Sequence, residues 1–230
     1  MSAMEGKSAI FMKIRASLKA SPDDTARKAA VAARLGEPPR GIIPGRGQLP
    51  GEARVRLFVA MAEKYNATTA RTADIDSLPA EVSAYLRSRN LPTAIRIGGD
   101  PRLALAPWAQ ETTLEIRHGA SDGHDLAAVS HAFGGVAETG TLAVLSGPDN
   151  PVTLNFLPEH HIVVLRAEDV AGDMETIWAK LREHEGRGVM PRTVNFITGP
   201  SRSADIEQTL LLGAHGPRAL HIIIVGAPVD

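Results

Sequence analysis

From Glu52 onward the sequence alternates between short apolar runs typical of β-strands and amphipathic stretches typical of helices. Alternating β and α units pack stably as a mostly parallel sheet with helices on both faces. We predict strands at residues 67–71, 93–97, 114–117, 127–133, 140–145, 161–166, 193–198 and 220–225. We predict helices at residues 54–65, 79–89, 173–184 and 202–213, where apolar side chains recur on one face.

Two of the predicted strands, at 127–133 and 140–145, break the simple alternation. The residues between them, 134–139, are too few for a helical crossover. This spacing favours an antiparallel pair or one sharply bent strand. The predicted fold class is therefore α/β, with a mixed, mostly parallel sheet.

The first fifty residues have a different character from the rest. Apolar residues recur at helical spacing over residues 8–19, which predicts a helix with one apolar face. Residues 32–51 are dense in glycine and proline with basic residues between them, which predicts an irregular arm. We therefore expect an N-terminal helix and arm over residues 1–50 and an α/β domain over residues 51–230.

Composition and motifs exclude several classes of function. Lys and Arg (25) nearly balance Asp and Glu (26), which argues against a dedicated nucleic-acid binder. The chain has no cysteine, so it cannot supply thiolate ligands to an iron–sulfur cluster. Gly45-Arg46-Gly47 resembles part of a dinucleotide fingerprint, but Pro50 occupies the last glycine position and no strand precedes it. No apolar stretch approaches the roughly 20 residues that span a bilayer, so we expect a soluble, cytoplasmic protein with no membrane span.

The segment after residue 198 is the first candidate for an anion site. A Gly-Pro turn would place Ser201 and Arg202 at the start of the predicted helix, where free backbone N–H groups favour an anion. The alternative is that Ser201 only caps this helix while Asp205 and Glu207 complement its dipole.

The second candidate is the glycine-flanked sequence around Glu138. Glu138 would be a base, a nucleophile or an acceptor for a hydroxylated ligand, with Thr139, Gly140 and Thr141 beside it. The alternative is a solvated acid in a loop. The strand patterns on either side favour a site.

The third candidate is the histidine pair that precedes an apolar run. We expect His160 or His161 to face the core or the site end of the sheet. We expect no metal site, because the histidines follow no ligand spacing. In parallel sheets ligands collect at the carboxyl ends of the strands, so we expect Glu138, Thr139, Arg202 and His161 to meet there.

The residues that carry these candidates also carry a family resemblance. GVAETGTLAVLSGPDNPVTLNFLPEHHIVVL, followed by VNFITGPSRSADIEQTLLLGAHGPRALHIIIV, closely resembles the LUD domain of the lactate-utilisation protein C family, with a dense match from about Gly119 to Val225. The resemblance implies a fold similar to that of sugar-phosphate isomerases and CoA transferases. It also implies the site residues Glu138, Thr139, Gly140, Thr141, His160, His161, Ser201, Arg202, Asp205 and Glu207.

The same resemblance implies a role in oxidation of L-lactate to pyruvate beside partner subunits that carry the iron–sulfur clusters. This chain would hold no cofactor and would bind a small anion at the strand ends. Two alternatives stay open. The chain could be a stand-alone CoA transferase- or isomerase-like enzyme that uses Glu138, or a non-catalytic scaffold that docks a partner through its first helix and arm.

Overall fold

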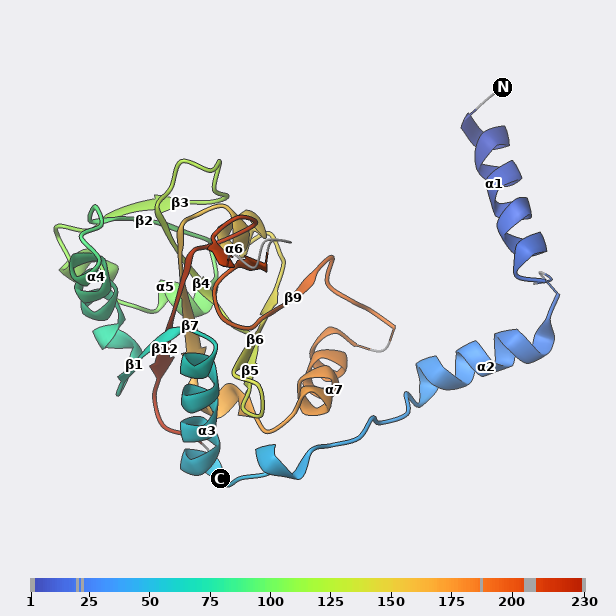
Figure 1. Cartoon of the computed structure of the whole chain (residues 1–230), viewed down its shortest axis with the longest axis horizontal. Helices are drawn as coiled ribbons and strands as arrows, with labels where there is room; N and C mark the ends of the chain where they lie inside the picture. Colours follow the sequence, from blue (N-terminus) through green and yellow to red (C-terminus); the bar gives the residue numbers. More distant parts are fainter. Residues whose placement is uncertain (1–2, 20, 22, 187, 205–209, 229–230) are drawn as a thin grey trace. The chain divides into compact units, whose positions relative to one another are not determined.

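A computed structural model describes residues 3–19, 21, 23–186, 188–204 and 210–228 (Figure 1). The chain divides into two compact units, Met1–Gly41 and Ile42–Asp230. Among the described residues no helix is long and apolar enough to cross a membrane. The sequence analysis placed the boundary between the N-terminal arm and the α/β domain at residue 50. That boundary stays a prediction.

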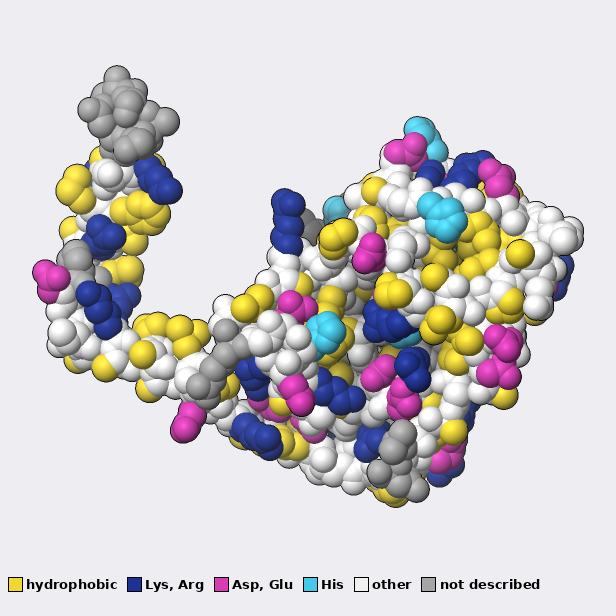
Figure 2. All heavy atoms as spheres, turned by 180° about the vertical axis from the view of Figure 1, so that it is seen from behind, with side chains coloured by type: hydrophobic (Ala, Val, Ile, Leu, Met, Phe, Trp, Pro, Cys, Tyr) yellow, Lys and Arg dark blue, Asp and Glu magenta, His cyan; other side chains and the backbone are white. Residues whose placement is uncertain are grey.

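The first unit contains helices α1 (Ala3–Ser17) and α2 (Thr25–Gly36). The exposed apolar side chains of α1 include Ile10, Phe11 and Ile14, and apolar side chains gather on both helices in Figure 2. Helix α2 was not predicted, and the irregular arm was wrongly started at residue 32. The apolar residues of α2 are mostly small and none is buried, so the helix leaves a weak pattern in the sequence. Asp24 caps the helix by accepting a hydrogen bond from the Arg27 nitrogen.

The second unit is built on a six-stranded parallel sheet with the order β1-β12-β7-β4-β2-β3. These strands are β1 (Thr68–Thr72), β2 (Ala94–Ile97), β3 (Glu115–His118), β4 (Ala127–His131), β7 (His160–Arg166) and β12 (Ala219–Val225). The α/β class is confirmed, and each of the six predicted strands lies within two residues of its predicted bounds.

Helices cover both faces of this sheet. Ile162 and Val164 of β7 pack in the cluster that contains α4 (Leu78–Ser88), and α5 (Pro101–Ala104) lies near β4. Val163 and Leu165 point to the opposite face, where α3 (Gly51–Lys64) packs through Phe58. Consecutive residues of a strand point to opposite faces, which explains why β7 is apolar throughout.

A second sheet of four short strands packs on the α3 side with the order β8-β5-β6-β9. Its strands are β5 (Gly134–Val136), β6 (Thr141–Leu145), β8 (Val170–Ala171) and β9 (Val194–Ile197), and α7 (Met174–Glu185) packs against it. The antiparallel pair predicted between residues 127–133 and 140–145 is wrong, because β6 pairs antiparallel with β5 and residues 127–131 form β4 of the parallel sheet. The six-stranded sheet is wholly parallel, whereas the second sheet is mixed, because β5 pairs antiparallel with β6 and parallel with β8.

The helix predicted over residues 202–213 is wrong where the structure describes it. Strands β10 (Arg202–Ala204) and β11 (Leu210–Leu212) form an antiparallel pair, and residues 205–209 lie outside the described residues. The Gly213 nitrogen donates to the Ser201 carbonyl at 3.0 Å, and the Ser201 nitrogen donates to the Pro217 carbonyl at 2.9 Å. These bonds tie the two ends of the segment together, which a continuous helix would prevent.

The remaining short elements complete the second unit. They are the helix α6 (Thr153–Phe156) and the 3₁₀ turns η1 (Gly45–Gly47), η2 (Ile75–Ser77), η3 (Trp108–Gln110) and η4 (Ala167–Asp169). Helix α6 lies against β4 and β7.

Candidate functional site

The six-stranded sheet has a hollow at each end of its strands. Because all six strands are parallel, their amino ends share one edge and their carboxyl ends share the other. His160 and His161 begin β7, so they lie at the amino edge and not at the carboxyl edge where the sequence analysis expected the site. Strand-end reasoning failed here because the histidines start the strand and do not follow it.

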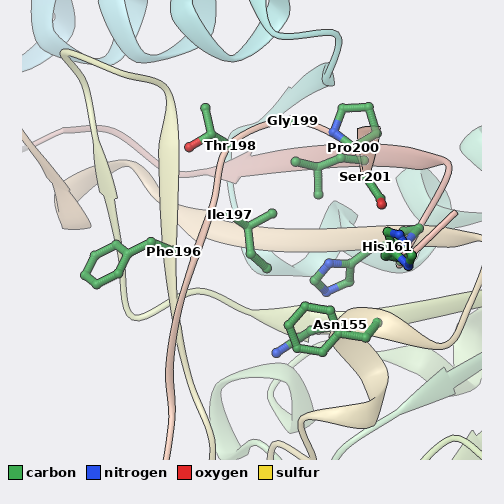
Figure 3. Close-up of a pocket in the computed structure, with 13 residues that line it drawn as sticks. Asn155, His161, Phe196, Ile197, Thr198, Gly199, Pro200 and Ser201 are labelled. Carbon is green, nitrogen blue, oxygen red and sulfur yellow. The ribbon is translucent and has the colours of Figure 1, made fainter. Parts of the chain in front are cut away.

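The amino-end cavity lies between β7, β12, α6 and the segment that follows β9, and has a volume of about 210 Å³ (Figure 3). Its polar lining residues are Asn155, His161, Thr198, Ser201 and His215. Phe156, Phe196 and Leu220 contribute apolar walls.

His161 is held neutral in this cavity. Its side chain is 1% exposed, and burial lowers its pKa to about 3. The Nε2 atom shares a 2.6 Å hydrogen bond with the Ser130 hydroxyl. The imidazole therefore carries no charge at neutral pH and works as a fixed hydrogen-bonding group.

His160 belongs to a different environment. Its Nδ1 shares a 2.9 Å hydrogen bond with the Tyr85 hydroxyl, and Tyr85 stacks on the His221 ring at 4.2 Å between centroids. Burial lowers the pKa of His160. His160 is not among the described residues that line the amino-end cavity, so the two adjacent histidines do not act on one ligand there.

Glu138 lies in the turn of the β5–β6 hairpin and is 6% exposed. The Glu138 nitrogen donates to the Gly172 carbonyl at 3.3 Å, and Oε2 lies 3.7 Å from the Arg46 Nε. A Cβ added at Gly47 would lie 3.3 Å from the Glu138 Cβ and would overlap the Gly172 carbonyl. The Gly-Arg-Gly segment that the sequence analysis set aside as a cofactor motif therefore packs over Glu138.

A row of hydroxyls runs from the hairpin turn to the amino-end cavity. The Oγ1 atoms of Thr139 and Thr141 are 2.7 Å apart, and those of Thr141 and Thr198 are also 2.7 Å apart. Thr198 lines the cavity. The predicted Thr139 and Thr141 thus reach the cavity only through Thr198.

Gly140 has a packing role in the same turn. Its φ is +65°, and a Cβ there would overlap the backbone nitrogen of Ala62 in α3. A side chain at this position would combine backbone strain with overlap.

The predicted anion site at Ser201 lacks the helix that it required. Ser201 lines the amino-end cavity, but Arg202 is exposed and its guanidinium lies 6.0 Å from the Tyr65 ring centroid. Asp205 and Glu207 lie outside the described residues. The cavity therefore brings His161 and Ser201 together, whereas Glu138 and Arg202 are not among its described lining residues.

The carboxyl-end hollow, of about 370 Å³, combines apolar residues such as Leu105 and Val225 with four charged groups that the sequence analysis did not name. They are Asp74, Arg102, Arg166 and Glu168, joined by His131. Arg102 Nη2 and Nε donate to the two carboxylate oxygens of Asp100 at 2.6 and 3.0 Å. Arg166 Nη2 lies 2.6 Å from Glu168 Oε1, and Figure 2 shows basic and acidic side chains gathered side by side on one face of this unit.

His131 is a neutral group in this charged hollow. Burial, helped by the charge of Arg102, lowers its pKa to about 4. Its Nδ1 donates a 2.6 Å hydrogen bond to the Ala132 carbonyl. In the neutral ring Nε2 is therefore the acceptor atom.

The sequence did contain a signal for this hollow. His131 and Arg166 are the last residues of β4 and β7, and Arg102 follows β2 in the next helix. Applying the strand-end rule to the predicted strands would have selected Arg166, whereas His131 lies two residues before the end of the strand predicted over residues 127–133. Among the described residues, no group of three or more His, Asp or Glu side chains is placed to hold a metal ion.

A substitution at Gly140 tests the hairpin packing. Gly140→Ala should lower the free energy of unfolding by about 3 kcal/mol or more, because strain and overlap act together. Gly123→Ala is the matched control, since Gly123 has a φ of +94° but open space around it. It should cost only about 1 kcal/mol by urea denaturation, and equal costs for the two variants would contradict the packing role.

The buried histidines predict a loss of stability in mild acid. The folded pKa values of His131, His161 and His221 are lowered to about 4, 3 and 4, so the unfolded chain binds protons first as the pH falls below about 6.5. Each histidine should remove about 2 kcal/mol of stability between about pH 6.5 and pH 5. Denaturation curves of His161→Gln should show a loss that is smaller by about that amount, whereas the exposed His118→Gln should follow the parent protein. An unchanged pH dependence in His161→Gln would contradict the burial argument.

Comparison with known proteins agrees with the fold and with the resemblance in the sequence. The LUD domain family matches residues 55–225. Lactate utilization protein C from Geobacillus kaustophilus is 34% identical over 125 residues, covering 51% of this chain and 52% of that protein. The protein of the same name from Geobacillus thermodenitrificans is 38% identical over 107 residues, covering 45% of each. The chain thus spans about half the length of the curated relatives it matches.

A solved structure shows a similar fold. The crystal structure of a DUF162 family protein from Deinococcus radiodurans superposes with a TM-score of 0.56 at 20% identity, covering 77% of this chain and 99% of that one. The family match extends over more than half of the chain and includes all six strands of the parallel sheet and the hairpin strands β5 and β6. The chain belongs to the LUD domain family.

Proposed function

We propose that this chain serves L-lactate utilisation as a subunit without its own redox centre, and that its carboxyl-end hollow holds a small hydroxy acid. The relatives named lactate utilization protein C support the process. The observation that carries the ligand assignment is the pair Arg102 and Arg166 beside neutral His131.

Hydrogen-bonding capacity supports a carboxylate ligand. A guanidinium has five N–H donors, and Arg166 contacts Glu168 through Nη2. The Asp74 carboxylate in the hollow accepts from the Ser77 nitrogen and hydroxyl, and Asp100 is engaged by Arg102. Asp74 Oδ1, both Asp100 oxygens and Glu168 Oε1 thus have partners within the chain, whereas N–H groups of Arg166 remain for a ligand carboxylate.

His131 supports a hydroxy acid over a plain carboxylate. Its Nε2 is an acceptor, so it would take a hydrogen bond from the hydroxyl next to the carboxylate. Lactate presents this arrangement of a carboxylate with an adjacent hydroxyl. The hollow opens at the carboxyl edge of the parallel sheet, where ligands of α/β proteins collect.

The subunit role is supported by composition and by the first unit. The chain has no cysteine, so clusters that accept electrons from lactate would belong to partner subunits. Exposed apolar residues of α1, Ile10 and Phe11 among them, would dock such a partner. A cytoplasmic location and the absence of a cofactor in this chain are parts of the same proposal.

The alternative enzyme that uses Glu138 has less support. The Glu138 side chain is 8% exposed and packs beneath Gly45–Gly47, so a substrate would reach its carboxylate only if this segment moved.

Binding of L-lactate to the purified chain tests the ligand assignment. Arg166→Leu should weaken binding by roughly 10- to 100-fold, as expected when a charged hydrogen bond of about 1.5–3 kcal/mol is lost. Arg117→Leu is the matched control, because Arg117 is likewise partly exposed and paired with a nearby acid, Glu115. It should bind like the parent protein in calorimetric titration, and equal binding by Arg166→Leu would overturn the site.

Deletion of the gene tests the process. The deletion strain should grow poorly on L-lactate and normally on pyruvate, because only the oxidation step would be lost. Complementation with the Arg117→Leu gene should restore growth on L-lactate, and the Arg166→Leu gene should restore it incompletely. Equal growth defects on both carbon sources would contradict the role.

A further inference from the structure

The side chain of Asn155 in α6 is buried without partners. It is 1% exposed, and neither its Nδ2 nor its Oδ1 has a hydrogen-bond partner among the described residues. A buried polar group left unpaired costs about 1–3 kcal/mol, so such an amide calls for a partner. Asn155 lines the amino-end cavity beside His161 (Figure 3).

The rest of this cavity selects against charge. None of its described lining residues is Asp, Glu, Lys or Arg. Of its two histidines, His161 is buried and neutral, and His215 is exposed. A charged ligand would therefore lose its hydration without meeting an opposite charge. The walls formed by Phe156, Phe196 and Leu220 favour an apolar body.

The volume limits the size of the ligand. The cavity holds about 210 Å³, which is below the roughly 300–1,000 Å³ of pockets for drug-sized ligands. A single ring with one polar substituent suits this space, whereas a nucleotide or a dinucleotide exceeds it.

We propose that the amino-end cavity binds a small uncharged ligand with a carboxamide or lactam edge, paired with the amide of Asn155. An amide offers a donor and an acceptor side by side, so a second amide edge satisfies both atoms of Asn155 at once. The Thr198 and Ser201 hydroxyls in the wall would contact further polar atoms, and the ring of the ligand would lie against the apolar walls. This cavity lies at the opposite edge of the sheet from the carboxyl-end hollow and would bind an uncharged ligand, whereas that hollow would bind an anion. The proposal therefore does not depend on the proposed lactate site.

Benzamide and benzoate test this proposal on the full-length protein. They share one ring and one shape, but only benzamide is neutral with a donor and an acceptor on one edge. Titration monitored by the imidazole NMR signals should show benzamide binding that shifts His161 and leaves His131 unchanged. Benzoate should bind at least tenfold more weakly, and absent benzamide binding or equal binding of the two compounds overturns the proposal.

Two matched substitutions separate a ligand role from a structural role. Asn155→Leu should reduce benzamide affinity at least tenfold. It should not lower the melting temperature, because leucine is similar in volume to asparagine and leaves no unpaired amide in the protein. Asn150→Leu should lower the melting temperature and keep benzamide binding, because the Asn150 Nδ2 donates to the Leu145 carbonyl at 2.7 Å. Full benzamide affinity in Asn155→Leu overturns the proposal, and if that variant does not fold, the comparison of benzamide with benzoate decides.

Discussion

The parallel pairing of β7 with β4 on one side and β12 on the other is the constraint on which the structure depends. It fixes which residues face each helical layer, because Ile162 and Val164 must pack toward α4 when Val163 and Leu165 pack toward α3. It also fixes the two ends of the strand. At about 3.3 Å per residue, His161 and Arg166 lie about 16 Å apart along β7.

This separation gives one strand two chemical environments. At its amino end the buried His161 is neutral, and the cavity around it has apolar walls and an unpaired amide. At its carboxyl end Arg166 shares a hollow with Arg102 and two acids. The sites proposed for a neutral and a charged ligand thus lie at opposite edges of the sheet, and neither includes Glu138, whose carboxylate packs against the Arg46 segment.

The fold was largely predictable because strand patterns are local. The apolar runs of β4, β7 and β12 are set by burial on both faces, which leaves a plain signal in the sequence. The segment after Ser201 was not predictable, because the bonds that fold it back join Ser201 to Gly213 and Pro217 and leave no periodic trace. Helix α2 was missed because it depends on the Asp24 cap and on alanine, and not on a buried apolar face. Of the residues expected to meet, His161 lies in the amino-end cavity, at the opposite edge of the sheet from the one expected, and neither Glu138 nor Arg202 is among the described residues that line it. His131 was passed over since its spacing to other histidines is irregular, and only the assembled sheet shows that it lies beside Arg102 and Arg166.

The proposed lactate site places a hydroxy acid between the guanidinium groups and His131 at the carboxyl end of the sheet. The most direct measurement follows the imidazole NMR signals of His131 and His161 during titration with L-lactate, and with propionate, which has the carboxylate but no hydroxyl. We expect L-lactate to shift the signals of His131 alone, and propionate to shift them less at equal occupancy, because the lactate hydroxyl would donate to Nε2. A shift of His161 in place of His131, or identical shifts with both compounds, would contradict this proposal.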